Sequence, residues 1–448
     1  MKKATLFILS IMVVLLGCTN KEKDQKSTSQ EKNIPTPIRT EPSFMTSQED
    51  AFNKGNKIES SRKKKLADFG IINVSLPTPT PNIDIARDIL NPNNMKKNNI
   101  IVFTNYSWNI PSFPFDYEND IAVLKSLYKL HNLDRVIPEN GSDMVKMQSL
   151  MKYTYTFLNG GKLPEQGSVT GPSAFLITEN RRVKGIGGTS EVYAVLLCQL
   201  SLSCGYNSRI ISMHAFDSNG KPLTHDVCET YVNSQGKWVA FDAYNSATYY
   251  LRDSIPQSAL ELHKVAVENR IREIYPVSVL HETTEIASLR DQVLPMFKYI
   301  YMWRMNNILS SSPRNGSISW QALYQTHLVW EDALSLVSEG GFDKIDKFSQ
   351  GGVKFVTHTR SDFEWMLDHV NTTLERKDND RIAFYLTTFT PNFDYFEIKI
   401  DSNQKTPIKN NIIKSKNVFI NQTIRNAYII TPVNKLGTKG FSSFVEFE

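Results

Sequence analysis

Three side chains in the middle of the chain, Ser190, His225 and Asp242, have the residue types of a hydrolytic triad. A serine hydroxyl is a weak nucleophile that needs a histidine as base, and the histidine ring needs a carboxylate to orient it. Because geometry and not chain order defines a triad, these positions could form one. The chemistry would be attack on an amide carbonyl, with Ser190 as nucleophile, His225 as general base and Asp242 as the orienting group.

Ser190 lies where the sequence predicts the start of a helix. Gly187 and Gly188 allow a sharp turn, and apolar residues then recur at helical spacing until Gly205, a typical helix-ending residue. A side chain at a helix N-terminus is close to unpaired backbone N–H groups and the positive end of the helix dipole, which stabilise an anion. The alternative is that Ser190 only caps this helix, because serine is a common N-cap residue whatever the function.

The other two candidates lie on the predicted strands of a hairpin. Residues 223–232 and 237–242 are β-branched and aromatic runs, and a turn at 233–236 separates them. His225 opens the first strand and Asp242 closes the second. Each also has a simpler interpretation: His225 could be a partly exposed polar residue at a strand start, and Asp242 could be a turn residue.

Taken in order, these motifs resemble the transglutaminase-like superfamily of papain-like folds. The family pattern is Gly-x-Cys, an apolar helix, Gly-x-x-x-Arg, a histidine that opens one strand and Gly-x-Trp-x-x-x-Asp that closes the next. The matching residues are Gly188, Gly205, Arg209, His225, Gly236, Trp238 and Asp242. The resemblance implies an α+β fold, with N-terminal helices packed on an antiparallel sheet, and amide chemistry by a cysteine, a histidine and an aspartate.

One departure from the family pattern changes the functional expectation: Ser190 occupies the position of the catalytic cysteine. A thiol with a pKa near ~8.5 ionises readily beside a histidine, whereas a hydroxyl needs an aligned base and oxyanion donors. We therefore expect a pseudoenzyme that binds a peptide or a glycan. The alternative is an active Ser-His-Asp amide hydrolase or acyl transferase, and a third possibility is a purely structural surface protein.

Other conspicuous side chains of this region are expected to be structural. Arg209 is predicted to pair with a carboxylate or a carbonyl, and Trp238 to pack in the core beneath the hairpin. Cys198, Cys204 and Cys228 allow at most one disulfide, between the Ser190 helix and the His225 strand, and buried free thiols are the alternative. Their spacing is not that of a zinc site, and we expect neither a metal ion nor another cofactor.

The N-terminus predicts the location of the protein. Residues 1–3 are basic, residues 6–16 form a short apolar segment, and residues 15–18 (Leu-Leu-Gly-Cys) resemble a bacterial lipobox. The resemblance implies cleavage before Cys18 and a lipid anchor on that residue. Thr19 follows where an aspartate would suggest inner-membrane retention, so we expect the outer membrane of a bacterial envelope. An ordinary secretory signal with an incidental cysteine is the alternative.

The chain of 448 residues is long enough for about three domains of ~150 residues. The predicted parts are a lipoprotein signal peptide (1–17), a disordered tether (18–66), a transglutaminase-like core (67–255), a mainly helical extension (256–370) and an accessory β-sandwich (371–448). The last part has period-two strands with glycines in the final turn, which is typical of Ig-like or fibronectin-like sandwiches.

Composition and motifs together define the expected partners. A net charge of +5 is small for this length and the chain has no platform of basic and aromatic residues, so nucleic acid is not expected. We expect a peptide, protein or cell-wall polysaccharide ligand, and contact with the membrane through the lipid on Cys18.

Overall fold

The computed structural model describes residues 100–103, 111, 115–163, 173–216, 222–251, 254–278, 280, 289–311, 327–330, 355–357, 359–377, 381–402, 412–421 and 426–447. All of them lie in the second of the chain's two compact units, residues 64–448. The predicted signal peptide, Cys18 and the tether lie outside the described residues. In the described part, the protein is a mixed α and β structure built on antiparallel sheets, and no helix there is long and apolar enough to cross a membrane.

The largest sheet has eight strands in the order β6-β5-β4-β3-β2-β7-β8-β9. All neighbours are antiparallel except β8 and β9. The strands are β2 (Ser208–Phe216), β3 (Pro222–Val232), β4 (Lys237–Asp242), β5 (Ala247–Tyr250), β6 (Tyr275–Ser278), β7 (Tyr299–Trp303), β8 (His327–Trp330) and β9 (Phe355–Thr357). The predicted hairpin is β3 and β4, joined by a 3-10 turn (η3, Asn233–Gln235) and by Gly236 at φ +62°.

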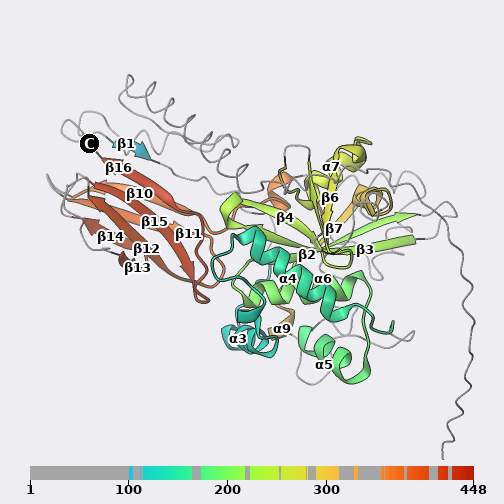
Figure 1. The fold of residues 1–448 in the computed structure, drawn as a ribbon. Coiled ribbons are helices and arrows are strands. Elements are labelled where there is room, and N and C mark those ends of the chain that lie inside the picture. The colour runs from blue at the N-terminus through green and yellow to red at the C-terminus, as the bar shows by residue number, and fades with distance from the viewer. Residues whose placement is uncertain are drawn as a thin grey trace, which may run out of the picture. The chain divides into compact units, whose positions relative to one another are not determined.

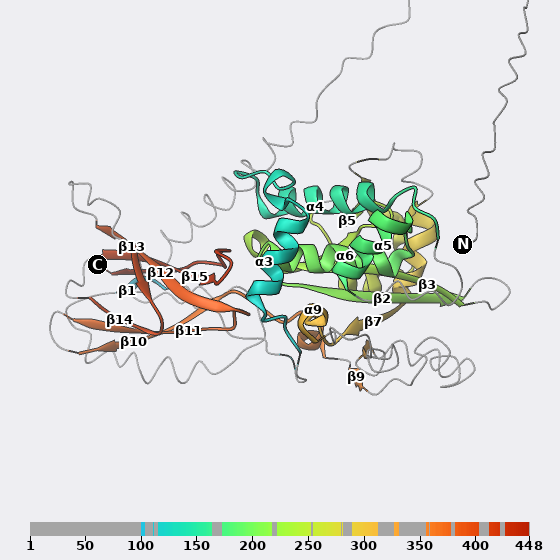
Figure 2. The same ribbon diagram turned by 90° about the horizontal axis from the view of Figure 1, so that it is seen from below.

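Four helices lie on one side of this sheet: α3 (Ile121–Leu130), α4 (Asp143–Leu158), α5 (Ala174–Lys184) and α6 (Ser190–Ser203). Helix α6 packs directly on β2 and β3, and α3, α4 and α5 pack on α6. Figure 2 shows α4, α5 and α6 together on one side of β2 and β3. Every residue of α6 except Glu191 is buried, including the polar residues Gln199, Ser201 and Ser203. This helix is therefore the centre of the first hydrophobic core, between the other helices and the sheet.

The ends of the helices follow from local chemistry. The side chain of Asp120 accepts hydrogen bonds from the first turn of α3, and that of Ser142 does the same for α4, so free backbone donors are satisfied. Helix α6 ends at Ser203 and Cys204 is its C-cap; Gly205 follows with φ +87°, and a Cβ there would lie 2.1 Å from Thr438 Oγ1. Only glycine fits this position, because both the backbone conformation and the close neighbour exclude a side chain.

The other face of the sheet carries α7 (Ala259–Val267) and short 3-10 turns at η4 (Ile271–Glu273) and η5 (Leu294–Lys298). Figure 1 shows α7 on the side of the sheet opposite α4. A second hydrophobic core fills this side and includes Trp238 and Trp365. The α7 helix begins with a capping box, in which the Ser258 hydroxyl and the Glu261 carboxylate satisfy each other's backbone N–H groups.

The structure differs from the expectation of a mainly helical extension at 256–370. Its described residues include α7 and the one-turn helix α9 (Ile308–Ser311), but also β6, β7, β8 and β9, which all extend the central sheet. Pro276 is tolerated in β6 because β6 lies at the edge of the sheet, where one side of the backbone needs no partner.

Two further sheets form the C-terminal part. One has the order β1-β16-β15-β12-β13 and the other β10-β11-β14, and a single core lies between them. The strands are β1 (Ile100–Phe103), β10 (Val370–Arg376), β11 (Ile382–Thr388), β12 (Phe393–Ser402), β13 (Ile412–Ser415), β14 (Val418–Asn421), β15 (Asn426–Asn434) and β16 (Ser443–Phe447). Strand β1, expected in the core domain, pairs instead with β16.

Candidate functional site

Ser190 is the first residue of α6, one position after the N-cap residue Thr189. Its hydroxyl oxygen accepts a hydrogen bond from the backbone N–H of Asp226 at 3.1 Å and donates one to Asp226 Oδ2 at 3.4 Å. The side chain is almost buried, with the residue 8% exposed. The hydroxyl therefore connects the start of α6 to strand β3, and the alternative that Ser190 caps its own helix is not what the structure forms.

His225 and Asp242 form a close pair on neighbouring strands. Nε2 of His225 lies 2.8 Å from Asp242 Oδ2, and Asp242 is fully buried. The Asp242 carboxylate also accepts hydrogen bonds from the Asn245 backbone at 3.1 Å, from Asn245 Nδ2 at 2.8 Å and from the Tyr249 hydroxyl at 2.7 Å. The turn after β4 and strand β5 thus hold the carboxylate in place.

The alternation of side chains along β3 separates this pair from Ser190. Cys228 packs in the core on the α6 side, whereas Val227 packs in the core on the α7 side. With a period of two, Asp226 shares the face of Cys228 and His225 shares the face of Val227. Within the described residues, no hydrogen bond joins Ser190 to His225 or Asp242. The structure brings two of the three predicted residues together and places the third beside Asp226.

Charge fixes the protonation of the His225–Asp242 pair. Burial alone would lower the pKa of His225, but the Asp242 carboxylate, with a smaller contribution from Asp226, outweighs burial and raises it. Burial alone would raise the pKa of Asp242, but the imidazole and the Tyr249 and Asn245 donors outweigh it and lower it. The pair is therefore stabilised as imidazolium and carboxylate.

Asp226 is the site residue that the sequence reading missed. Its Oδ1 accepts a hydrogen bond from Ser212 Oγ at 2.5 Å, and Trp303 Nε1 in turn donates to Ser212 Oγ at 3.0 Å. Burial raises the pKa of Asp226 despite the serine donors and the nearby His225. Asp226 directly follows His225 in the sequence, but only the alternation of side chains along β3 shows that it faces α6.

A second carboxyl group lies near Asp226. Burial and the charge of Asp226 raise the pKa of Glu191, in the first turn of α6, to about 8. Glu191 Oε1 has no hydrogen-bond partner among the described residues. The start of α6 therefore holds two acidic groups that disfavour each other's ionisation, and not an imidazole that would favour an anionic nucleophile.

Tyr244, in the turn after β4, links the two groups of residues. Its ring centroid lies 5.9 Å from that of His225 and 5.2 Å from that of Tyr193 on α6, both in edge-on contact. Tyr244 is 42% exposed. An exposed aromatic ring beside the His225–Asp242 pair is a surface feature that a ligand could contact.

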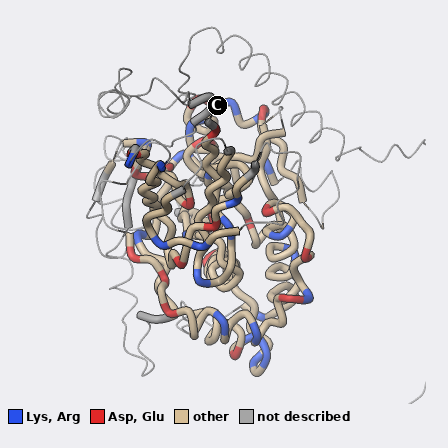
Figure 3. Tube along the Cα trace, turned by 90° about the vertical axis from the view of Figure 1, so that its left-hand side faces the viewer, with Lys and Arg blue, Asp and Glu red and all other residues tan. Residues whose placement is uncertain are grey.

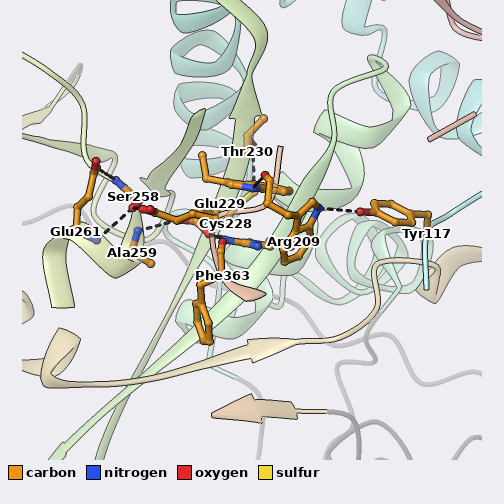
Figure 4. A network of polar contacts seen from close by, with 12 residues as sticks. Tyr117, Arg209, Cys228, Glu229, Thr230, Ser258, Ala259, Glu261 and Phe363 are labelled. Atoms are coloured by element: carbon orange, nitrogen blue, oxygen red, sulfur yellow. Dashed lines mark hydrogen bonds and ion pairs between the residues drawn. The ribbon is translucent and has the colours of Figure 1, made fainter. Parts of the chain in front are cut away.

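Arg209 and Trp238 have the structural roles expected of them, and Figure 4 shows Arg209 beside Glu229. Arg209 and Glu229 face each other across β2 and β3, with Nε and Oε2 2.7 Å apart, and both are buried. Glu229 also accepts from the backbone N–H of Ala259, the first residue of α7, at 2.7 Å. The guanidinium lies over the Trp238 ring, 3.9 Å from its centroid. These contacts tie α7 to the middle of the sheet.

The three described cysteines are free, and Cys198 and Cys228 are buried. No cluster of three or more His, Cys, Asp or Glu residues in the described ranges could hold a metal ion. Along the described trace, basic and acidic residues are interspersed (Figure 3).

Comparison with known proteins adds little. No family model matches the chain, and no curated protein matches it either. Among solved structures, the chain is similar to the crystal structure of red sea bream transglutaminase, with 9% sequence identity and a TM-score of 0.23. The match covers 73% of this chain and 52% of that one, so the chain spans about half of that protein's length. At such a TM-score the likeness establishes neither a shared topology nor a shared activity.

Proposed function

We propose that this chain is a lipid-anchored cell-envelope protein whose transglutaminase-like domain binds a peptide or a glycan without turning it over. The observation that carries the proposal is the placement of the Ser190 hydroxyl, which is bound to Asp226 on one face of β3, while His225 is bound to Asp242 on the other. A serine nucleophile needs its base within hydrogen-bond reach. Without that contact the hydroxyl stays protonated and unreactive.

The proposed fold is a papain-like and transglutaminase-like core followed by an Ig-like or fibronectin-like sandwich. The order of motifs supports it: helix α6 starts at the position of the family's cysteine, and β3 and β4 carry the matched histidine and aspartate. The exposed ring of Tyr244 beside His225 supports a ligand at this place, since aromatic rings supply a large contact area at low entropic cost.

Binding is tested with purified peptidoglycan sacculi and the detergent-solubilised full chain. The protein should co-sediment with sacculi, and Tyr244→Ala should weaken this several-fold while leaving the melting temperature within about 2 °C, because Tyr244 lies at the surface and outside the hydrophobic cores. Tyr275→Ala, at another exposed tyrosine, is the matched control. No co-sedimentation, or equal weakening by both variants, would remove the binding proposal at this site.

The envelope location rests on residues 15–18 and has its own test. Cys18→Ala should leave an unprocessed precursor, and the protein should no longer partition into the detergent phase, because the lipid is attached to that thiol. A processed, detergent-partitioning Cys18→Ala protein would rule the lipoprotein proposal out.

The second candidate function is an active Ser-His-Asp amide hydrolase or acyl transferase. The observation that favours it is the formed His225–Asp242 pair at 2.8 Å, which supplies two of the three residues of a triad. The reaction would require Ser190 to leave Asp226 and reach the imidazole. A serine-reactive phosphonate probe separates the candidates: it should label Ser190 in a hydrolase and fail to label it in a binding protein.

A further inference from the structure

The Asp242 carboxylate is held much more tightly than a residue that merely ends a strand requires. Asn245 contributes two donors, its backbone N–H and its side-chain amide, and Tyr249 contributes its hydroxyl. All three point at Asp242, and Tyr249 is fully buried on β5. Two neighbouring elements thus supply polar groups to one carboxylate, and that carboxylate has one further partner, the His225 ring.

The polar contacts of the His225 ring all lie at Nε2, where Asp242 Oδ2 is the near partner and Asn245 Nδ2 lies further away at 3.5 Å. Nε2 faces Asp242 at 2.8 Å, and Nδ1 has no hydrogen-bond partner among the described residues. When the ring is neutral, the proton must reside on Nε2, because a carboxylate accepts and cannot donate. The lone pair of Nδ1 is then directed away from Asp242. In the protonated ring the same atom becomes a donor.

We propose that Asn245 and Tyr249 are positioning residues that act through Asp242 to hold His225 in a single tautomer, with Nδ1 presented to a hydrogen-bonding group of the ligand. The proposal rests on the proposed function, in that the ligand lies beside Tyr244 and His225. An amide group fits Nδ1 best: its N–H can donate to the neutral ring, and its carbonyl can accept from the protonated ring. A backbone-like amide therefore suits this atom in both states of the histidine.

The surrounding charges are compatible with a neutral amide. The charged groups that act on His225 are Asp242 and Asp226, both carboxyl groups, and they raise its pKa against the opposing effect of burial. An imidazolium that is already paired with Asp242, with Asp226 nearby, leaves no net positive charge to favour an anionic ligand group. A neutral amide satisfies Nδ1 at no such cost.

The test is nitrogen-15 NMR of the histidine rings in the full chain, recorded on the alkaline side of the His225 titration. His225→Gln assigns the His225 signals among the 8 histidines of the chain. The wild type should show only the tautomer with the proton on Nε2. Tyr249→Phe and Asn245→Ala should each show a mixture of the two tautomers, and Asp242→Asn should lose the preference for Nε2 completely. A residue with a purely structural role would alter the melting temperature but not the tautomer.

Tyr231→Phe is the matched control, because Tyr231 is also a buried tyrosine of this sheet, and its hydroxyl contacts His369 at 2.6 Å. It should leave the His225 tautomer unchanged. An unchanged tautomer in both Tyr249→Phe and Asn245→Ala would overturn the positioning proposal, as would a wild-type ring with its proton on Nδ1. If Tyr249→Phe does not fold, Asn245→Ala, in a half-buried turn position, decides alone. Loss of sacculus binding has no bearing on this readout, so the two proposals fail separately.

Discussion

Strand β3 contributes to two buried acidic clusters that differ in one respect. Glu229 meets an opposite charge, Arg209, and a backbone donor from α7, so its cluster is electrically balanced. Asp226, three residues earlier on the other face, meets hydroxyl groups and a second carboxyl group, Glu191. A buried charge with a structural role requires such a partner of opposite charge. Two neighbouring carboxyl groups with an unsatisfied oxygen do not stabilise the fold by themselves. Buried acidic groups with shifted pKa values of this kind are typical of functional sites.

The first prediction tests the balanced cluster and has the largest expected effect. Arg209→Met should lower the free energy of unfolding by about 3–5 kcal/mol, because it leaves the Glu229 carboxylate buried without its partner. Urea denaturation measures this loss. Lys237→Met is the control, since the Lys237–Glu261 pair is partly exposed and should contribute about 1 kcal/mol or less. Equal losses in the two variants would mean that Arg209 is not a structural centre of the sheet.

The second prediction tests the like-charge cluster through pH. The pKa of Glu191 is raised to about 8 in the folded protein, against ~4.3 in an unfolded chain. The folded state therefore holds a proton that the unfolded state has lost, and stability falls as pH rises through this window.

Glu191→Gln removes that proton and should abolish the fall. Relative to the wild type, the variant should gain on the order of 2–4 kcal/mol between pH ~4.3 and pH ~8, measured by urea denaturation across the range. Glu139→Gln, at an exposed turn position, should keep the wild-type dependence. A Glu191→Gln profile parallel to that of the wild type would show that the two carboxyl groups do not oppose each other.

The third prediction uses a thiol at position 190 to distinguish the two interpretations of Ser190, as a structural link or as a nucleophile. In Ser190→Cys, the neighbouring carboxyl groups should raise the pKa of the thiol above its usual ~8.5 and slow its reaction with iodoacetamide at neutral pH. Adding Asp226→Asn should accelerate labelling about tenfold, and adding His225→Ala should not change it. Fast labelling that depends on His225 would instead indicate a triad and favour the hydrolase.

The sequence predicted the helix and strands of this site better than it predicted how their side chains are placed. Helix α6 and the β3–β4 hairpin were predictable because local signals mark them: apolar periodicity, Gly205 at the helix end and Gly236 in the turn. The face of β3 on which His225 lies was not predictable, since a shift of one residue in strand register moves every side chain to the opposite face. Short strands such as β8 and β9 also escaped prediction, because three or four residues carry no periodic signal.

The smallest effect concerns the hydroxyl of Ser190 itself. Ser190→Ala removes the acceptor for the Asp226 backbone N–H and one donor to its carboxylate, and leaves the helix cap at Thr189 untouched. A buried hydrogen bond of this kind contributes about 0.5–1.5 kcal/mol, so the loss in unfolding free energy should stay near 1 kcal/mol. Thr189→Ala is the matched control, because the Thr189 side chain makes no capping hydrogen bond. If Ser190→Ala leaves stability unchanged but abolishes turnover of an amide substrate, the hydroxyl is a nucleophile. If it costs about 1 kcal/mol and leaves sacculus binding intact, the hydroxyl is a structural link between α6 and β3, and the contrast between the two faces of the strand holds.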